Sequence, residues 1–275
     1  MKAIPVYFQV FATFARNSLV RDMTFRTNFI IQTLTSVVWM SIQLSFYAIV
    51  LGYTDEIGRN TGWTKYPFYT FIATTMLVNG LMQALVMRNA EEFSELIRTG
   101  RLDFALLKPI DTQFLISFHR IEWSSLTNFA YGLVVLGYSL VGMGHVPNPI
   151  EIVLYIVYVL CGVAIMYSLI ICLAATSVWM GRNQSLYDFW FYITTFSRYP
   201  MEIYKGPIGR PLAFAFTFVI PIMLAMNIPA RIMAFPLADQ NWPLILIGLA
   251  ATIGALIASR FVFKLALAGY RSASS

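Results

Sequence analysis

Hydrophobic residues gather in six long stretches, separated by shorter segments that hold most of the charged residues. The stretches are residues 29–51, 66–87, 121–143, 150–180, 211–227 and 243–263. A helix needs about 20 mostly apolar residues to cross ~30 Å of hydrocarbon, and all but the fifth stretch reach that length comfortably. The pattern therefore predicts an all-α integral membrane protein with six transmembrane helices, built as one transmembrane domain over residues 1–275.

Lysine and arginine residues follow alternate connections between these stretches. Of the 19 in the chain, only Arg59, Lys65 and Arg231 fall on the side that carries the first, third and fifth connections. Cytoplasmic connections of membrane proteins are enriched in these residues, so both termini are expected in the cytoplasm. The net charge of +6 then needs no nucleic-acid partner. A composition of 58% hydrophobic and 12% charged residues also excludes a disordered chain.

Three further segments have a predicted place at the membrane surface. Residues 5–23, within a cytoplasmic segment 1–27, have apolar residues at helical spacing and predict an interfacial helix; a tail packed on the bundle is the alternative. The stripe consists of Tyr7, Val10, Phe11 and Phe14. The aromatic-rich residues 183–198 predict a helix embedded at the inner interface. Residues 228–242, interrupted by prolines, predict an irregular, partly re-entrant outer element before the sixth helix.

Residues 88–119, between the second and third stretches, carry the most informative polar pattern. Asn89 followed by Glu91 and Glu92 is typical of a helix N-cap with acidic residues in the first turn. An apolar face follows, formed by Phe93, Leu96 and Ile97. The pattern predicts a short, capped amphipathic helix on the cytoplasmic side.

The end of this helix is also marked in the sequence. Arg98 suits the last turn and Gly100 the position beyond the C-cap, while Asp111 can cap the next helix. Two uses of the amphipathic helix remain open: docking on a soluble partner, or packing beneath the bundle.

Neutral polar residues recur on one face of two predicted transmembrane helices, whose central parts hold no charge. In the first helix they are Gln32, Ser36 and Gln43, with Trp39 among them; in the second they are Thr75, Asn79 and Gln83. These faces either line a translocation path or hydrogen-bond between helices. In the sixth helix Ala250, Gly254 and Ala258 form a stripe of small residues that predicts close helix contact.

The chemistry of an enzyme is missing from this pattern. His119 and His145 are the only histidines and fall near opposite surfaces, and no cluster has metal-ligand spacing. The chain has no G-x-x-x-x-G-K-[ST] motif, so it has no Walker-type site for ATP. The absence of charge within the helices weakens a proton- or sodium-driven carrier. We expect no cofactor in this chain, and energy for uphill transport would have to come from a partner.

The arrangement resembles the ABC-2 type of ABC transporter permeases, and the sequence resembles a bacterial branch of that family. The likeness lies in the segment 95–109 (ELIRTGRLDFALLKP), in 198–200 (RYP), in 217–221 (TFVIP) with Pro229-Ala230, and in 270–275 (YRSASS). It implies a multi-pass protein of the bacterial cytoplasmic (inner) membrane. It also implies a permease subunit of an exporter that works with an ABC ATPase subunit, which holds ATP and Mg²⁺, and with a second permease chain, identical or related.

The resemblance further implies that residues 91–98 form the coupling helix seated in the ATPase. The polar contacts would come from Glu91, Glu92, Glu95 and Arg98, and the anchors would be Phe93, Leu96 and Ile97. Gly100 and Asp103 would shape the turn that carries the push to the third transmembrane helix. A carrier or channel working alone, and a membrane-embedded enzyme or scaffold, remain alternative functions.

Overall fold

The computed structural model describes residues 3–180 and 185–270, and this part of the chain is helical, with no β-strand. The all-α fold is therefore confirmed. The main helices are α1 (Ala3–Thr24), α2 (Arg26–Tyr53), α3 (Lys65–Met82), α4 (Arg88–Arg98), α5 (Leu102–Leu106), α6 (Thr112–Phe118), α7 (Leu126–Met143), α8 (Pro149–Ala175), α9 (Ser177–Met180), α10 (Ser185–Thr195), α11 (Gly206–Phe214), α12 (Ile222–Ala234) and α13 (Trp242–Gly269). Short π- or 3₁₀-turns are η1 (Gln83–Met87), η2 (Trp123–Ser125), η3 (Met201–Ile203), η4 (Ala215–Val219) and η5 (Leu237–Asp239).

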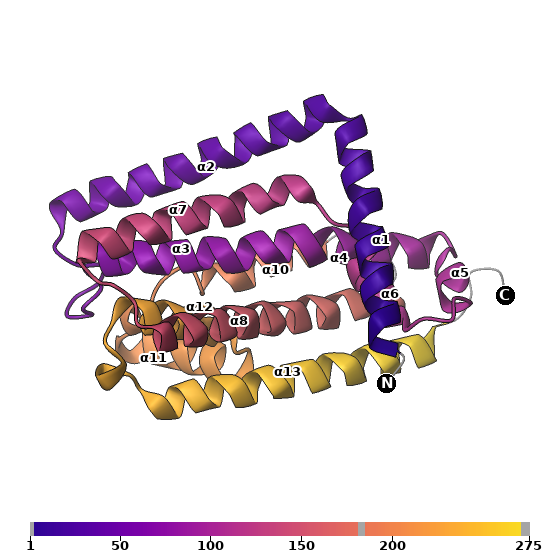
Figure 1. Ribbon diagram of the computed structural model, residues 1–275. Coiled ribbons are helices and arrows are strands. Elements are labelled where there is room, and N and C mark those ends of the chain that lie inside the picture. Colours follow the sequence, from indigo (N-terminus) through magenta and orange to yellow (C-terminus); the bar gives the residue numbers. More distant parts are fainter. Residues whose placement is uncertain (1–2, 181–184, 271–275) are drawn as a thin grey trace.

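Long helices lie side by side and run between two ends of the molecule (Figure 1). We call the end that carries α4, α5 and α6 the inner end, and the end that carries residues 54–64 the outer end. Among the described residues, five helical segments are long and apolar enough to cross a membrane. They are Arg26–Tyr53, Lys65–Arg98, Trp123–Met143, Pro149–Trp179 and Trp242–Gly269. The chain is thus a multi-pass membrane protein, as predicted.

The N-terminal helix α1 lies across the inner end, nearly perpendicular to the other long helices (Figure 1). Its predicted apolar stripe packs on α6: the rings of Tyr7 and Phe114 are 4.9 Å apart, and those of Phe11 and Phe118 are 6.1 Å apart. A second set of apolar side chains, Val6, Phe8 and Val20, is exposed on α1. The stripe read from the sequence therefore packs on the protein, while other apolar side chains of the helix stay exposed and available to a bilayer interface.

The fifth passage along the bundle is made by α10 and the segment after it. At the inner end, Ser177 Oγ lies 2.7 Å from Ser94 Oγ of α4. By Glu202 the chain has reached the outer end, because Trp63 Nε1 donates to Glu202 at 2.9 Å, and Lys205 Nζ donates to the carbonyl of Arg59 at 2.8 Å. The prediction that 183–198 stays at the inner interface is wrong, within the described residues of that range. An 11-residue helix lacks the length that marks a span in the sequence.

Residues 206–234 form a hairpin that enters the bundle from the outer end and returns to it. Its two halves, Gly206–Val219 and Ile222–Ala234, meet at 91°. The first half follows Lys205, and the second is followed by Phe235, whose ring lies 5.0 Å from that of Trp63. The predicted fifth transmembrane helix, 211–227, is therefore wrong, and the predicted outer element begins at 206 rather than 228. Hydropathy misled because α12 is buried in protein rather than in lipid.

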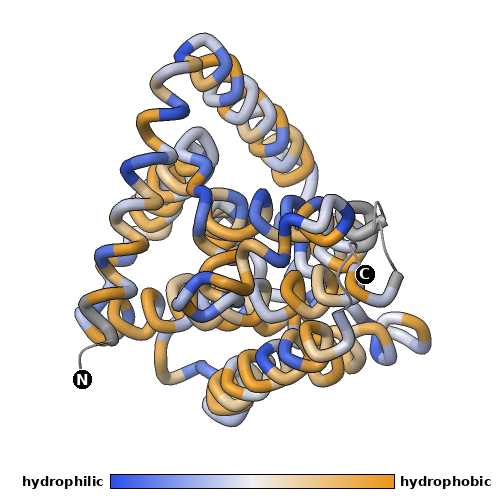
Figure 2. Tube along the Cα trace, turned by 90° about the vertical axis from the view of Figure 1, so that its right-hand side faces the viewer, coloured by the Kyte–Doolittle hydropathy of each residue, from blue (hydrophilic) through white to orange (hydrophobic). Residues whose placement is uncertain are grey.

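The corrected path changes which basic residues lie at each end. In the described part of the chain the inner end holds ten basic residues. These are Arg16, Arg21, Arg26, Arg88, Arg98, Arg101, Lys108, Arg120, Arg260 and Lys264. Figure 2 is a view onto this end, coloured by the hydropathy of each residue. The outer end holds five: Arg59, Lys65, Lys205, Arg210 and Arg231. Lys2, Arg182 and Arg271 lie outside the described residues. The bias still favours a cytoplasmic inner end, and this orientation stays a prediction.

Thiol labelling in intact cells tests the corrected path. In a Cys161→Ala, Cys172→Ala background, Lys205→Cys should react with a membrane-impermeant maleimide added outside. Leu107→Cys, at the inner end, should react only after the cells are permeabilised. Reaction of Lys205→Cys only after permeabilisation would place residue 205 in the cytoplasm, as predicted from the sequence, and contradict its position at the outer end.

The hairpin packs against the middle of α8 through a close backbone contact. A Cβ built on Gly162 would lie 2.4 Å from the carbonyl oxygen of Ala225 in α12. A Cβ placed on Gly254, in the predicted contact stripe of α13, would have no heavy atom within 4 Å, and all three residues of the stripe are exposed, so the predicted close helix contact is not made within the described chain.

These two glycines give a matched pair of substitutions. Gly162→Ala should lower the free energy of unfolding by about 1–3 kcal/mol, because α8 and α12 must move apart to admit the methyl group. Gly254→Ala should leave it unchanged or raise it slightly, since alanine has the higher helix propensity. Denaturant titration of both variants in detergent measures the difference, and equal stabilities would contradict the contact.

Candidate functional site

The region 88–119 is joined to the second membrane helix without a break. The segment Lys65–Arg98 is one helix of 34 residues, in which α3 passes through the π-turn η1 into α4. At ~1.5 Å per residue it is about 50 Å long, so α4 extends beyond a hydrocarbon core of ~30 Å. The predicted start of a separate helix at Asn89 is therefore wrong. No loop separates α4 from α3.

Asn89 is buried and holds the chain that leads to α7 against this helix. Its side-chain amide donates to the carbonyls of Leu85 (2.8 Å), Ser117 (2.9 Å) and Arg120 (2.7 Å), and its oxygen accepts from the Arg120 amide at 3.1 Å. The carbonyl of Ala84 in the π-turn accepts from the Glu122 amide at 2.9 Å. Backbone groups that the π-turn and the bend after α6 leave without helical partners thus form hydrogen bonds with one another and with the Asn89 side chain.

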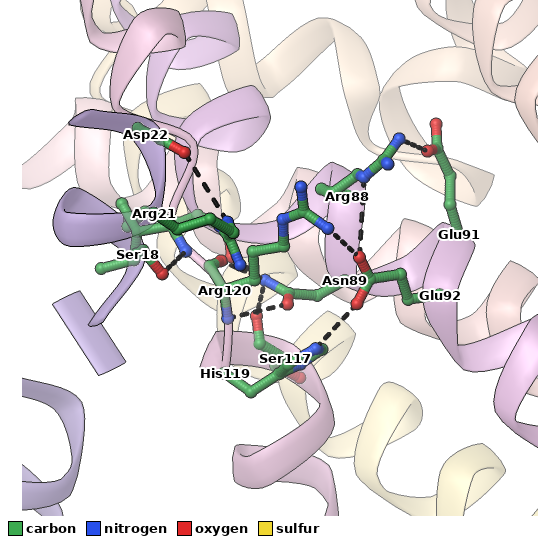
Figure 3. A network of polar contacts seen from close by, with 12 residues as sticks. Ser18, Arg21, Asp22, Arg88, Asn89, Glu91, Glu92, Ser117, His119 and Arg120 are labelled. Atoms are coloured by element: carbon green, nitrogen blue, oxygen red, sulfur yellow. Dashed lines mark hydrogen bonds and ion pairs between the residues drawn. The ribbon is translucent and has the colours of Figure 1, made fainter. Parts of the chain in front are cut away.

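Glu92 lies at the centre of an ionic cluster beside Asn89 (Figure 3). It contacts His119 Nε2 at 2.8 Å, the guanidinium of Arg120, and Arg88 at 3.6 Å. The hydrogen bond from His119, followed by that from Arg120, outweighs the effect of burial and lowers the pKa of Glu92 to about 2. Because the folded-state pKa is depressed, the cluster stabilises the fold above the ordinary glutamate pKa, and this contribution is lost as pH falls toward 2.

The predicted anchor face of α4 is turned toward the rest of the chain. Phe93 is 1% exposed and packs against Phe263 of α13, with ring centroids 5.7 Å apart. Leu96 and Ile97 are half-buried against the same core. Phe93 is therefore not available to anchor α4 in a partner, and the apolar face packs beneath the bundle. Of the predicted polar contacts, Arg98 is exposed and its guanidinium donates to the Glu95 carboxylate at 2.9 Å on the solvent-facing side of α4.

Gly100 ends α4 as predicted. Its φ of +68° is in the left-handed region that favours glycine, and it follows the C-cap residue Thr99. The turn leads into α5, where Leu102 is fully buried while Phe104 and Leu107 are 70% and 81% exposed. These two apolar side chains were missed from the sequence. Figure 1 shows α5 at the extreme inner end of the molecule.

A cavity of about 440 Å³ opens beside Phe104. Its walls include Phe14 of α1, Leu96 of α4 and Leu115 of α6, and its lining includes the basic residues Arg101 and Lys108. A large apolar side chain flanked by acidic residues, on a partner protein, would be complementary to this cavity in shape and charge. The spacing of residues 102–108 as a short amphipathic helix was the signal that could have identified it.

Asp111 caps α6 as predicted and also ties it to α13. Its carboxylate accepts from the Phe114 amide at 3.0 Å and from the guanidinium of Arg260, which also donates to Gln113 at 2.9 Å. Burial opposes ionisation, but the bonds from Arg260 and Phe114 outweigh it and lower the pKa of Asp111. The Asp111 amide also donates to the Tyr7 hydroxyl of α1 at 3.3 Å, so α1, α6 and α13 are connected at this residue.

A second site lies within the membrane-spanning part, between α2, α3 and the segment after α10. A cavity of about 550 Å³ is lined by four of the six residues proposed for a path: Gln43, Thr75, Asn79 and Gln83. Gln83 also accepts a hydrogen bond from Asn128 of α7 at 2.7 Å. The structure thus brings four residues of the two polar faces together around one cavity, and one of the four, Gln83, also forms a hydrogen bond between helices.

The other two predicted residues lie elsewhere. Gln32 accepts from Ser124 Oγ at 2.8 Å, which is an interhelical hydrogen bond near the inner end of α2. Ser36 is not part of the cavity wall, whereas Trp39, on the same face of α2, is.

Two residues that the sequence placed in an inner connection, Arg198 and Tyr199, also line this cavity. Gln43 is ten residues from the outer end of α2 and Asn79 fourteen residues from that of α3, which places the site about 15–20 Å inside the bundle. A charged side chain at that depth costs about 2.5–3.5 kcal/mol on insertion scales and is a marker of function. The proline-broken stretch 211–227 was the available signal that the fifth helix had been misplaced.

No group of three or more metal-binding side chains occurs among the described residues. The sequence profile of a family described as ABC-2 family transporter protein matches residues 37–274. Comparisons with curated proteins and with solved structures found no match.

Proposed function

The chain belongs to the ABC-2 family of transporter proteins, the membrane permeases that normally work with ABC ATPase subunits, and from this premise we propose that it forms half of an ATP-driven exporter. A second permease chain, identical or related, supplies the facing wall of the path. Separate ATPase subunits bind ATP and Mg²⁺ and dock on the inner end, in the cytoplasm of a bacterial cell. The direction of transport is proposed from the broader ABC-2 class.

The observation that carries the proposal is the rigid extension of the second membrane helix beyond the bilayer. Since α3 and α4 are continuous, a force applied to α4 acts on α3 without an intervening flexible loop. Asn89 and the Glu92 cluster connect the same helix to the segment that begins α7. Closure of the ATPase would therefore tilt the second and third membrane helices together.

The docking surface that we propose differs in part from the one read from the sequence. The polar contacts remain with Glu91, Glu95 and Arg98, while Glu92 acts inside the chain by holding α4 in place. Phe104 and Leu107 replace Phe93 as the apolar contacts. Gly100 and Asp103 shape the turn that presents α5, and the cavity beside Phe104 accepts an apolar side chain of the ATPase.

Site-specific photo-crosslinking in native membranes tests this assignment. A photo-reactive amino acid at position 107 should crosslink the full-length chain to an ABC ATPase, identified by mass spectrometry. The matched control is position 146, because Leu107 and Val146 are exposed to 81% and 88% at opposite ends of the molecule.

The outcomes separate the alternatives. An ATPase adduct from position 107 but not from 146 supports the proposal. An adduct from 146, or transport by the purified chain without ATP or a second subunit, would overturn it in favour of a reversed orientation or of a carrier working alone.

A further inference from the structure

Arg198 lies where two cavities meet. The cavity of about 550 Å³ between α2 and α3 and a smaller one of about 130 Å³ toward Trp190 and Met87 share Arg198, Asn79 and Gln83 in their walls. Among the described residues that line either cavity, Arg198 is the one charged side chain. The positive charge therefore stands on the route that joins them.

The charge of Arg198 is not neutralised within the described part of the chain. Its guanidinium lies over the ring of Phe191, 4.8 Å from the centroid, and it forms no ion pair with a carboxylate among the residues whose side chains the structure describes, which exclude 180–189. Arg260, on α13 at the inner end, is by contrast paired with Asp111. A stacked but unpaired guanidinium keeps its N–H groups available to an anion from outside the chain.

Apart from Gln43, the wall that α2 contributes to the larger cavity is apolar and largely aromatic. These side chains belong to α2 and are Trp39, Met40, Ile42, Phe46 and Tyr47, the last of which is also an electrostatic neighbour of Arg198. Trp39 and Phe46 are 68% and 56% exposed, so this wall is open to a ligand with a hydrocarbon portion. The side-chain amides of Gln43 and Asn79 add N–H donors to the same cavity.

We propose that this cleft binds an amphiphile with an anionic head group, a phosphate or a carboxylate, as the substrate class of the transporter. The head group pairs with Arg198, and the hydrocarbon portion lies along the aromatic wall of α2. This inference rests on the proposed function only in taking the cleft as the path; the binding itself needs no ATPase.

The charge and the wall together exclude other classes of ligand. A cation would be repelled by Arg198, and a wholly apolar ligand would leave the arginine desolvated without a partner. A small free anion would gain nothing from the aromatic wall.

Native mass spectrometry of the full-length protein in a neutral detergent tests the proposal. The probes are dioctanoyl phosphatidylglycerol, which is anionic, and dioctanoyl phosphatidylcholine, which has the same tails and no net charge. The wild-type protein should bind the anionic lipid about tenfold more tightly or better, as expected for a charge-assisted contact. Arg198→Gln should lose this preference, and Arg198→Lys should keep most of it.

The control variant is Arg210→Gln, which removes an exposed arginine on α11 and should keep the preference. An unchanged preference in Arg198→Gln would overturn the proposal, and so would displacement of the lipid by inorganic phosphate at equal concentration. Either failure would leave the crosslink from position 107 intact. Loss of that crosslink, conversely, would leave the lipid preference unchanged, so the two proposals fail independently.

Discussion

Replacing Phe104 and Leu107 together by glutamate should release the ATPase subunit and abolish ATP-driven transport. Both side chains are exposed at the tip of α5, and a few large apolar residues carry most of the affinity of a typical interface, at about 2 kcal/mol or more each. Two buried carboxylates would add a desolvation penalty. We therefore expect the affinity for the ATPase to fall at least a hundredfold, measured by co-purification from native membranes and by transport-coupled ATP hydrolysis.

The control for this double variant is Val146→Glu, which puts a carboxylate on an equally exposed apolar position at the outer end. It should leave ATPase association and coupling at the wild-type level. Because neither Phe104 nor Leu107 is buried, the double variant should insert and unfold like the wild type. Normal coupling in a correctly inserted double variant would contradict the docking surface.

The second large effect is expected inside the chain, at Asn89. Asn89→Leu keeps the volume but removes every hydrogen bond of the buried amide, leaving the carbonyls of Ser117 and Arg120 and the Arg120 amide without this partner. Each unsatisfied buried group costs about 1–3 kcal/mol. We expect a loss of about 3 kcal/mol or more in the free energy of unfolding, measured by denaturant titration in detergent.

Asn79→Leu, the same substitution ten residues earlier, is the matched control. The Asn79 side chain lines the membrane cavity and makes no hydrogen bond in the described part of the chain, so this variant should be close to wild type in stability. If both variants unfold at the same denaturant concentration, Asn89 is not the clamp between α4 and the start of α7.

Local rules sufficed where a short segment determines its own conformation. Gly100 at the end of α4 and Asp111 at the start of α6 were predictable because a left-handed residue and a side-chain cap depend on immediate neighbours. The long apolar helices were predictable from length. Asn89 was misread because a cap and a buried clamp use the same side chain, and only the tertiary contacts with Ser117 and Arg120 distinguish them.

The candidate site in the membrane was predictable only in part. Gln43 and Asn79 were found because helical periodicity places polar residues on one face. Arg198 could not be found in this way, since α10 is short and α12 is as apolar as a true span while being packed in protein. Hydropathy measures transfer out of water and does not distinguish lipid from a neighbouring helix.

The outer hairpin has a mechanical consequence. Both of its ends are fastened at the outer end, through Lys205 to the loop 54–64 and through Phe235 to Trp63, so the hairpin is held from one end of the bundle. Its second half, α12, is buried along most of its length and meets α8 at the backbone contact between Ala225 and Gly162. A hairpin anchored in this manner has to move together with α8, so a tilt of that helix would also displace the outer loops to which the hairpin is attached.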